Sequence, residues 1–176
     1  MITENEIKPL FTSEMIQESI KELAGKLNDE YKGEEVYLVC VLKGAVMFMT
    51  DLAKYLTMPV KMEFIRLSSY GSGTTFSGKV NAVDISLPDL NGKNVLLVED
   101  IIDTGHTAKF LVDFVNHNFK VKSLKFCSLL DKKARRVVDI DADYYCLEVD
   151  DKFLVGYGLD LDGLYRNIPY IGYIEQ

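Results

Sequence analysis

Tryptophan is absent from this chain of 176 residues, which also has only two histidines, three cysteines and four prolines. The cysteines, Cys40, Cys127 and Cys146, are an odd set that lies far apart in apolar segments. Such a set argues against a disulfide framework or a zinc site. We therefore expect buried, reduced thiols in a cytoplasmic protein.

Long apolar runs are missing as well. No segment approaches the roughly 20 apolar residues that a membrane helix needs, and MITENEIKPLF lacks the basic and apolar regions of a signal peptide. Basic residues number 20 against 27 acidic ones, a formal net charge of −7. This deficit argues against nucleic acid or a membrane surface as a partner.

Apolar residues are plentiful at 48%, enough for a core, and the length fits one domain on the usual scale of roughly 100–200 residues. Apolar periodicity predicts helices over residues 13–32, 45–56 and 107–117, the first beginning at a capping Ser13 and ending near Gly33. We expect strands over residues 36–42, 61–70, 80–86, 95–100, 121–130 and 143–149. This alternation predicts a mostly parallel α/β sheet with helices on both faces.

The segment VLLVEDIIDTGHTA, residues 95–108, joins a buried strand to three carboxylates and a turn. Ligands of open α/β sheets lie beyond the carboxyl ends of the strands, where Glu99 and Asp100 would stand. The following turn leads into a helix, and its backbone N–H groups form a site suited to a phosphate. Together these features indicate a phosphorylated, hydroxyl-bearing ligand, although a capped helix with surface acids remains an alternative.

A second polar segment, GSGTTFSGK at residues 71–79, is rich in glycine, serine and threonine. It is consistent either with an ordinary hairpin connection or with a lid over an active site.

VLLVEDIIDTGHTA resembles the phosphoribosyl-diphosphate-binding signature of type I phosphoribosyltransferases. In chain order, LKGAVMF, RLSSYGSG, SLLDKKARR and DKFLVGYGLDLDGLYRN resemble other functional segments of hypoxanthine-guanine phosphoribosyltransferases, over about residues 36–175. The resemblance implies a single domain with a central, mostly parallel sheet flanked by helices. Its core would span about residues 36–140, with a hood from the N-terminal segment and about residues 141–176, and a flexible lid loop over about residues 69–80.

The resemblance also implies roles for the three carboxylates. Glu99 and Asp100 would hold the ribose hydroxyls, directly or through Mg²⁺, and Asp103 would be the general base that takes the proton from purine N7. The 5′-phosphate would be bound by Asp103, Thr104, Gly105, His106 and Thr107.

For the diphosphate, the family pattern assigns Lys43, Gly44 and Arg166, and the peptide before the lysine is often cis in this family. Arg136 matches a position near the same loop. Ser69 and Tyr70 match the start of the lid.

Purine recognition would fall to Lys132, Phe153 and Leu154, by donation to the 6-oxo group, stacking and backbone contacts respectively. Asp160 is assigned to this side of the site and also, with Glu99 and Asp100, to Mg²⁺. A lysine only donates hydrogen bonds, so Lys132 favours a 6-oxopurine over adenine. The remaining cations of the SLLDKKARR segment, Lys133 and Arg135, are expected to form a solvated surface.

The resemblance thus predicts transfer of the 5-phosphoribosyl group from 5-phosphoribosyl diphosphate to hypoxanthine or guanine, giving IMP or GMP and diphosphate, in a homodimer or homotetramer. Two alternatives remain open. One is a sister enzyme that prefers xanthine or another base, and the other is a non-catalytic regulator that senses nucleotides on the same fold.

Overall fold

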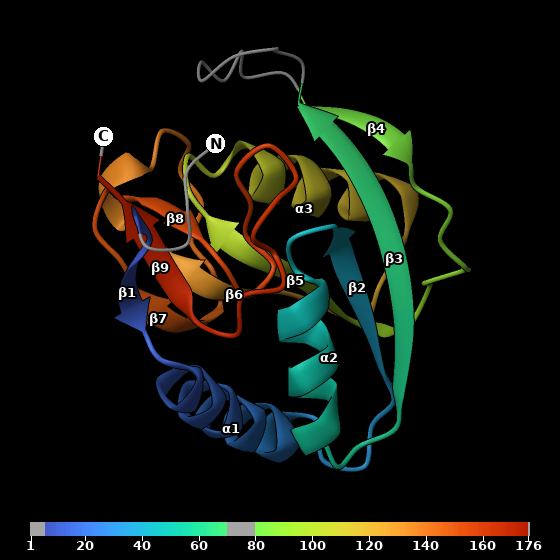
Figure 1. Ribbon diagram of the computed structural model, residues 1–176. Coiled ribbons are helices and arrows are strands. Elements are labelled where there is room, and N and C mark those ends of the chain that lie inside the picture. The colour runs from blue at the N-terminus through green and yellow to red at the C-terminus, as the bar shows by residue number, and fades with distance from the viewer. Residues whose placement is uncertain (1–5, 70–79, 176) are drawn as a thin grey trace.

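The computed structural model describes residues 6–69 and 80–175, and its largest element is a six-stranded sheet with the order β4-β3-β2-β5-β6-β7 (Figure 1). The strands are β2 (Val36–Leu42), β3 (Val60–Ser69), β4 (Val80–Asp84), β5 (Asn94–Ile102), β6 (Ser123–Asp131) and β7 (Tyr144–Glu148). All neighbours pair in parallel except β3 and β4, which are antiparallel. The predicted sheet is confirmed.

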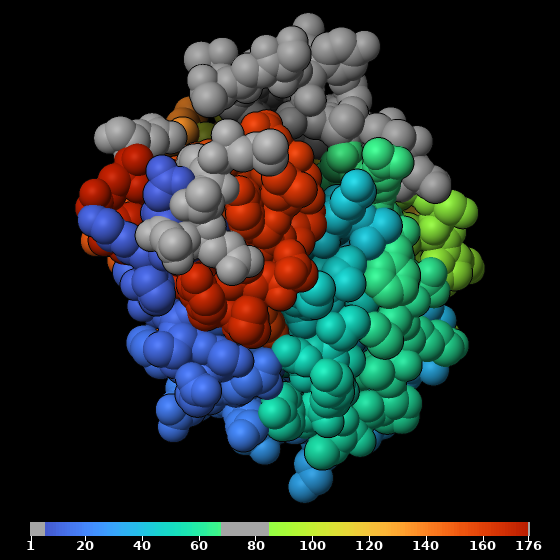
Figure 2. Space-filling view, in the orientation of Figure 1, coloured from blue at the N-terminus to red at the C-terminus, as the bar shows by residue number. Residues whose placement is uncertain are grey.

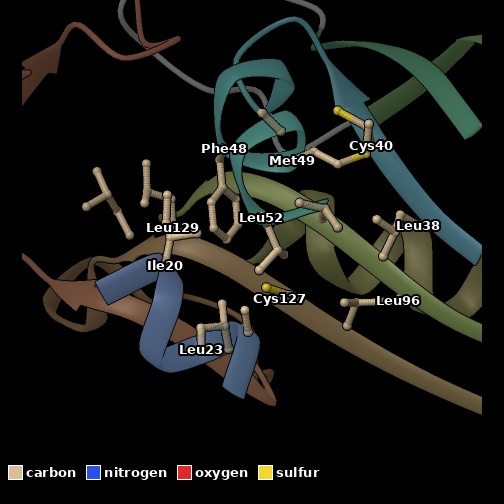
Figure 3. Packing of buried hydrophobic residues seen from close by; sticks show 14 of the residues in the cluster. Ile20, Leu23, Leu38, Cys40, Phe48, Met49, Leu52, Leu96, Cys127 and Leu129 are labelled. Carbon is tan, nitrogen blue, oxygen red and sulfur yellow. The ribbon is translucent and has the colours of Figure 1, made fainter. Parts of the chain in front are cut away.

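Helices cover both faces of this sheet, because its central strands are apolar on both sides. Helices α1 (Ser13–Glu30) and α2 (Val46–Tyr55) lie together on one face, and α3 (His106–Asn118) lies on the other (Figure 1). Successive residues of β2 point to opposite faces. Leu38 and Cys40 thus pack in the cluster beneath α1 and α2 (Figure 3), whereas Val39 packs in the cluster that includes Leu111 of α3.

Helix α1 begins at Ser13, as expected, but its capping residue lies one position earlier than the sequence suggested. Its N-cap is Thr12 rather than Ser13, and the Thr12 hydroxyl accepts a hydrogen bond from the Met15 N–H at 3.3 Å. Thr12 has extended backbone angles, which allow a capping hydroxyl to reach the N–H groups of the first turn. The helix ends at Glu30, before Gly33.

Three short strands that the sequence pattern missed form a second sheet, in the order β1-β9-β8. They are β1 (Lys8–Phe11), β8 (Phe153–Val155) and β9 (Ile171–Ile174). This sheet combines the N-terminal segment with the C-terminal region. Strand β7, in contrast, pairs with β6 in the large sheet, so the core continues beyond the boundary expected near residue 140.

All three cysteines are free, and burial raises the pKa of Cys40 and of Cys146 to about 12. Among the described residues, no helix is long and apolar enough to cross a membrane. The lid expected over residues 69–80, with Tyr70, lies outside the described residues apart from its two ends in β3 and β4.

Candidate active site

Three parallel strands end side by side at one edge of the large sheet, and each is followed by a candidate residue. Lys43 follows β2, Asp103 follows β5 and Lys132 follows β6, and these strands are direct neighbours in the order β2-β5-β6. Because the carboxyl ends of parallel strands meet at one edge, the fold brings together residues that are up to 89 positions apart in the sequence (132 − 43).

Glu99 and Asp100 lie near the end of β5 in an environment that disfavours their charge. Burial, together with the neighbouring Asp100, raises the pKa of Glu99 well above its usual range. Burial also raises the pKa of Asp100 to about 6, with the nearby Asp160 adding to the effect and the Ile101 N–H and Arg166 opposing it. These two carboxyl groups therefore favour a cation or hydroxyl groups as partners.

A cavity of about 240 Å³ opens beside these acids. It is lined by Val41, Leu42, Lys43, Gly44, Leu67, Glu99, Asp100, Thr107, Asp160 and Arg166. The Leu42–Lys43 peptide is cis, as the family pattern suggested. The lining thus combines acidic groups for hydroxyls with cationic groups for an anion.

The C-terminal loop completes this cavity. In the space-filling view, the orange-red C-terminal segment lies against the teal surface of the α2 region (Figure 2). A Cβ atom on Gly158 would lie only 2.0 Å from the Gly44 carbonyl oxygen, so the two loops touch at their backbones. Arg166 donates to the Gly158 carbonyl at 2.5 Å and pairs with Asp160 at 2.5 Å. The guanidinium is thereby held at the cavity wall.

The turn after β5 has the form expected of an anion site. Gly105 has a left-handed backbone (φ +87°) and precedes α3, whose N-terminus has no side-chain cap. Thr107, in the first turn of α3, lines the acid-containing cavity. The N-terminal end of a helix carries partial positive charge and N–H groups, which suit a phosphate.

A larger cavity of about 730 Å³ has Asp103 in its wall. It is lined by Asp103, Lys132, Arg135, Asp151, Lys152, Phe153, Tyr173, Ile174 and Glu175. The Lys132 ammonium donates to the Lys152 carbonyl at 2.8 Å and lies 3.6 Å from Asp151. An aromatic wall, a lysine and a carboxylate are groups that suit a flat, polar heterocycle.

Comparison with known proteins shows the family to which the chain belongs. A family profile described as the phosphoribosyl transferase domain matches residues 10–162. A curated hypoxanthine-guanine phosphoribosyltransferase from Streptococcus thermophilus is 45% identical over 169 residues, which are 96% of this chain and 93% of that protein. The chain belongs to the phosphoribosyltransferase family.

Solved structures agree with this membership. The crystal structure of a hypoxanthine phosphoribosyltransferase from Staphylococcus aureus superposes with a TM-score of 0.91 at 41% identity, covering 97% of this chain and 93% of that one. A hypoxanthine-guanine phosphoribosyltransferase structure from Bacillus anthracis gives a TM-score of 0.90 at 43% identity, covering 96% and 98%. The expected type I phosphoribosyltransferase fold is confirmed.

The structure shows where two of the expected residues lie. Asp160 lines the cavity with Lys43 and Arg166 rather than the one with Lys132, because its loop folds back over Gly44. Arg136 reaches the carbonyl groups of Ile102 and Asp103 instead of the Lys43 loop. Leu154 is buried and pairs with Tyr173 in the small sheet.

The described residues contain no group of three or more histidine, cysteine or acidic side chains that could hold a metal ion unaided. One Asp160 oxygen pairs with Arg166 and the other accepts the Gly163 N–H at 2.7 Å.

Sequence reasoning also missed the position of Arg135 at the larger cavity. Arg135, expected on a solvated surface, donates from Nε to Asp103 Oδ1 at 3.2 Å and from Nη1 to Asp151 at 3.4 Å. Arg135 is half-exposed, and nothing in the DKKARR segment indicates which of its four cations faces the cavity, so the sequence pattern placed Arg135 on the solvated surface. Lys133 is exposed, as expected, and contacts Glu148 and the Tyr145 hydroxyl.

Proposed function

We propose that the protein transfers the 5-phosphoribosyl group from 5-phosphoribosyl diphosphate to hypoxanthine or guanine, producing IMP or GMP and diphosphate. The observation that carries this proposal is that the end of β5 lines one cavity and the residue that follows β5 lines another. Asp100 faces the cavity with Lys43 and Arg166, whereas Asp103, three residues further along the chain, faces the cavity with Lys132. A sugar held beside the first would present C1′ toward a base held in the second.

The donor would occupy the smaller cavity. Its ribose hydroxyls would donate hydrogen bonds to Glu99 and Asp100, and its 5′-phosphate would bind the turn from Asp103 to Thr107, with the hydroxyls of Thr104 and Thr107 assisting. The diphosphate would contact Lys43, the backbone of Gly44 and Arg166. An arginine suits this role because its planar fork can donate two parallel hydrogen bonds to phosphate oxygens.

The purine would occupy the larger cavity. Lys132 would exchange its present hydrogen bond to the Lys152 carbonyl for one to the 6-oxo group. Phe153 would stack on the ring, and the backbone of Leu154 would accept from the 2-amino group of guanine. Adenine would place an amino group against a lysine that can only donate, which predicts its exclusion.

During transfer, the C1′–O bond to the diphosphate breaks, its electron pair leaves with the diphosphate, and purine N9 forms the new bond to C1′. Lys43 and Arg166 would stabilise the negative charge on the departing diphosphate. Asp103 would accept the N7 proton, which balances the positive charge that attack leaves on the base. General bases of this kind typically contribute about 10²–10⁴-fold to the rate.

A divalent cation fits this donor site, and we propose Mg²⁺. Burial disfavours the negative charge of Glu99 and Asp100, and Asp160 repels the charge of Asp100. A bound cation would therefore stabilise the charged form of these carboxyl groups. Mg²⁺ commonly binds through one or two carboxylates together with substrate phosphates, which agrees with the lack of a preformed centre among the described residues. When bound, it would offset part of the diphosphate charge.

We further propose a homodimer or homotetramer in the cytoplasm. Free cysteines are typical of that compartment. Met47 on α2 and Met62 and Phe64 on β3 are exposed apolar side chains that a subunit interface would cover. Analytical ultracentrifugation would test the assembly, and a monomer at micromolar concentration would contradict it.

The experiment that tests the activity is an assay with Mg²⁺, 5-phosphoribosyl diphosphate and each of adenine, guanine, hypoxanthine and xanthine. We expect IMP and GMP but no AMP. Product from xanthine alone would indicate the sister enzyme, and no product from any base would indicate a nucleotide-sensing regulator.

A further inference from the structure

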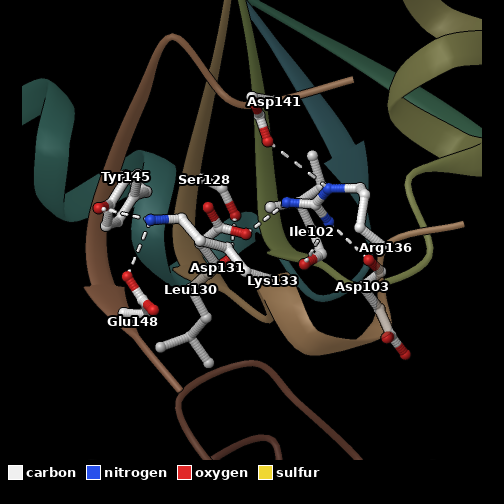
Figure 4. Close-up of polar contacts among 10 residues, drawn as sticks. All are labelled: Ile102, Asp103, Ser128, Leu130, Asp131, Lys133, Arg136, Asp141, Tyr145 and Glu148. Carbon is white, nitrogen blue, oxygen red and sulfur yellow. Dashed lines mark hydrogen bonds and ion pairs between the residues drawn. The ribbon is translucent and has the colours of Figure 1, made fainter. Parts of the chain in front are cut away.

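The segment that follows β6 lies directly behind the phosphate turn. Arg136 Nη1 donates to the carbonyl of Ile102 at 3.1 Å and to that of Asp103 at 2.5 Å (Figure 4). The next carbonyl, that of Thr104, accepts the N–H groups of Val137 at 3.0 Å and Val138 at 3.2 Å. Three successive carbonyls of the turn are therefore held from one side.

Arg136 is itself held by a buried ion pair. Its Nη2 contacts Asp131, the last residue of β6, whose side chain is 2% exposed, while that of Arg136 is 13% exposed (Figure 4). A buried ion pair gains little net stability, because the desolvation of both groups opposes their attraction. The pair is therefore better explained by what it orients than by what it adds to stability.

The geometry of the peptide bond shows what is oriented. In a trans peptide, the C=O of one residue and the N–H of the next point in opposite directions. Among the described residues only the Leu42–Lys43 peptide is cis. Holding the carbonyls of Ile102, Asp103 and Thr104 therefore directs the N–H groups of Asp103, Thr104 and Gly105 away from the 131–140 segment.

Packing at Gly105 also indicates that the N–H groups of the turn point away from the 131–140 segment. A Cβ atom there would lie 2.8 Å from Ile140, 2.9 Å from Val138 and 3.1 Å from Arg136 Cδ. The rear of the turn is thus filled by this segment, and an anion has to approach from the opposite side, where the N–H groups point.

We propose that Arg136 and Asp131 are positioning residues that orient the N–H groups of the turn toward the 5′-phosphate. The inference rests on the proposed function, since it assigns the turn to that phosphate. Arg136 touches no substrate in this arrangement and acts through the backbone.

The test compares GMP with guanosine, which differ only in the 5′-phosphate. Calorimetric titrations would use the wild-type protein, Arg136→Met, Arg136→Lys and the double variant Asp131→Asn/Arg136→Met. Loss of well-aligned N–H donors to a phosphate should weaken GMP binding about tenfold to hundredfold, with guanosine changed by less than about twofold. Arg136→Lys should fall between, because one ammonium cannot hold Asp131 and two carbonyls together.

The matched control is Lys133→Met, which removes a cation from the same segment at an exposed position outside both cavities. It should leave both affinities unchanged. The double variant guards against misfolding, since it leaves no unpaired buried charge.

The outcomes are distinct. GMP affinity that is unchanged in a folded Arg136→Met or double variant would overturn the proposal, as would a parallel loss of GMP and guanosine, which indicates a general structural role. In the wild-type protein, NMR signals of the Thr104 and Gly105 amides should shift with GMP and not with guanosine, and their failure to do so would also overturn it. A wild-type protein that binds no GMP and forms no product would refute the proposed function and this inference with it.

Discussion

Replacing Gly44 with alanine should disable the donor site by displacing a carboxylate. An added Cβ would lie 1.6 Å from Asp100 Oδ2 and 2.5 Å from its Cγ, whereas ordinary contacts begin at 3.4 Å. The carboxylate would therefore have to move by about 1.8 Å (3.4 − 1.6). Because the clash is with the end of a side chain rather than with backbone, we expect Asp100 to rotate and the protein to fold.

The expected loss of activity can be estimated from the displacement of the Asp100 carboxylate. A misplacement of about 1 Å in a reacting assembly can lower the rate about 10²-fold. We therefore expect kcat/KM for 5-phosphoribosyl diphosphate to fall at least about hundredfold, as the ribose loses one of its two acids.

Steady-state kinetics with hypoxanthine would measure this loss. Gly25→Ala is the matched control, because Gly25 lies within α1 with nothing within 4 Å of its added Cβ. It should leave activity unchanged and stabilise the protein by about 0.5–1 kcal/mol.

A double-mutant cycle separates this mechanism from damage to the diphosphate loop. If displacement of Asp100 is the cause, Gly44→Ala should have little further effect once Asp100→Ala is present. A full additional loss on that background, or near wild-type kcat/KM in the single variant, would refute the reasoning.

Four further predictions follow from individual side chains. Asp103→Asn should lower kcat about 10²–10⁴-fold while GMP binding by calorimetry survives, and near wild-type turnover would exclude Asp103 as the base. Lys132→Ala should raise KM for the purine about tenfold or more with a smaller effect on KM for the donor, and unchanged base affinity would show that the lysine is only a surface group. In metal-free buffer Asp100→Asn should raise the melting temperature at pH 8 by at least about 2–4 °C. Because burial raises the pKa of Asp100 to about 6 from 3.8, the folded protein holds the proton more tightly, and stability falls as the pH rises through that window. The gain should vanish near pH 4, and an equal gain at both pH values would contradict this origin. Asp51→Asn should lower the free energy of unfolding at pH 7 by roughly 1–3 kcal/mol. Burial raises the pKa of Asp51, but hydrogen bonds from Lys54, Tyr157 and Gln17 lower it, and the net result is a pKa below its usual value. The stabilisation that the charged Asp51 provides is therefore present above about pH 4 and is lost as the pH falls below that. Urea unfolding at both pH values would measure this, and a pH-independent difference would count against it.

Features encoded locally could be predicted from the sequence. The apolar run of β5, the acids at its end and the glycine before α3 are consecutive, so strand, carboxylates and turn follow from one stretch of chain. The parallel sheet follows from the alternation of strands and helices. The ends of helices were predicted less reliably: the capping residue of α1 is Thr12, one residue before the expected Ser13.

Features that depend on distant pairing could not be read in this way. Strands β1 and β9 have four residues each and pair across more than 150 positions, with Lys8 opposite Tyr173, so neither carries enough periodicity to be recognised alone. The DKKARR run, likewise, holds four cations of similar chemistry. Only the path of the chain after β6 decides that Lys132 faces the base cavity, Arg135 meets Asp103 and Arg136 turns behind the phosphate turn.

The kind of chemistry could be predicted from residue types and short spacings, because the acids, the lysine and the glycine-containing turn are local features of the chain. The tertiary structure alone decided which groups share a cavity and which orient others. Asp160 lines the same cavity as Lys43 rather than that of Lys132, because the loops at Gly44 and Gly158 touch backbone to backbone. These two glycines are 114 positions apart in the sequence (158 − 44). Such contacts result from the packing of the whole chain, and no local pattern encodes them.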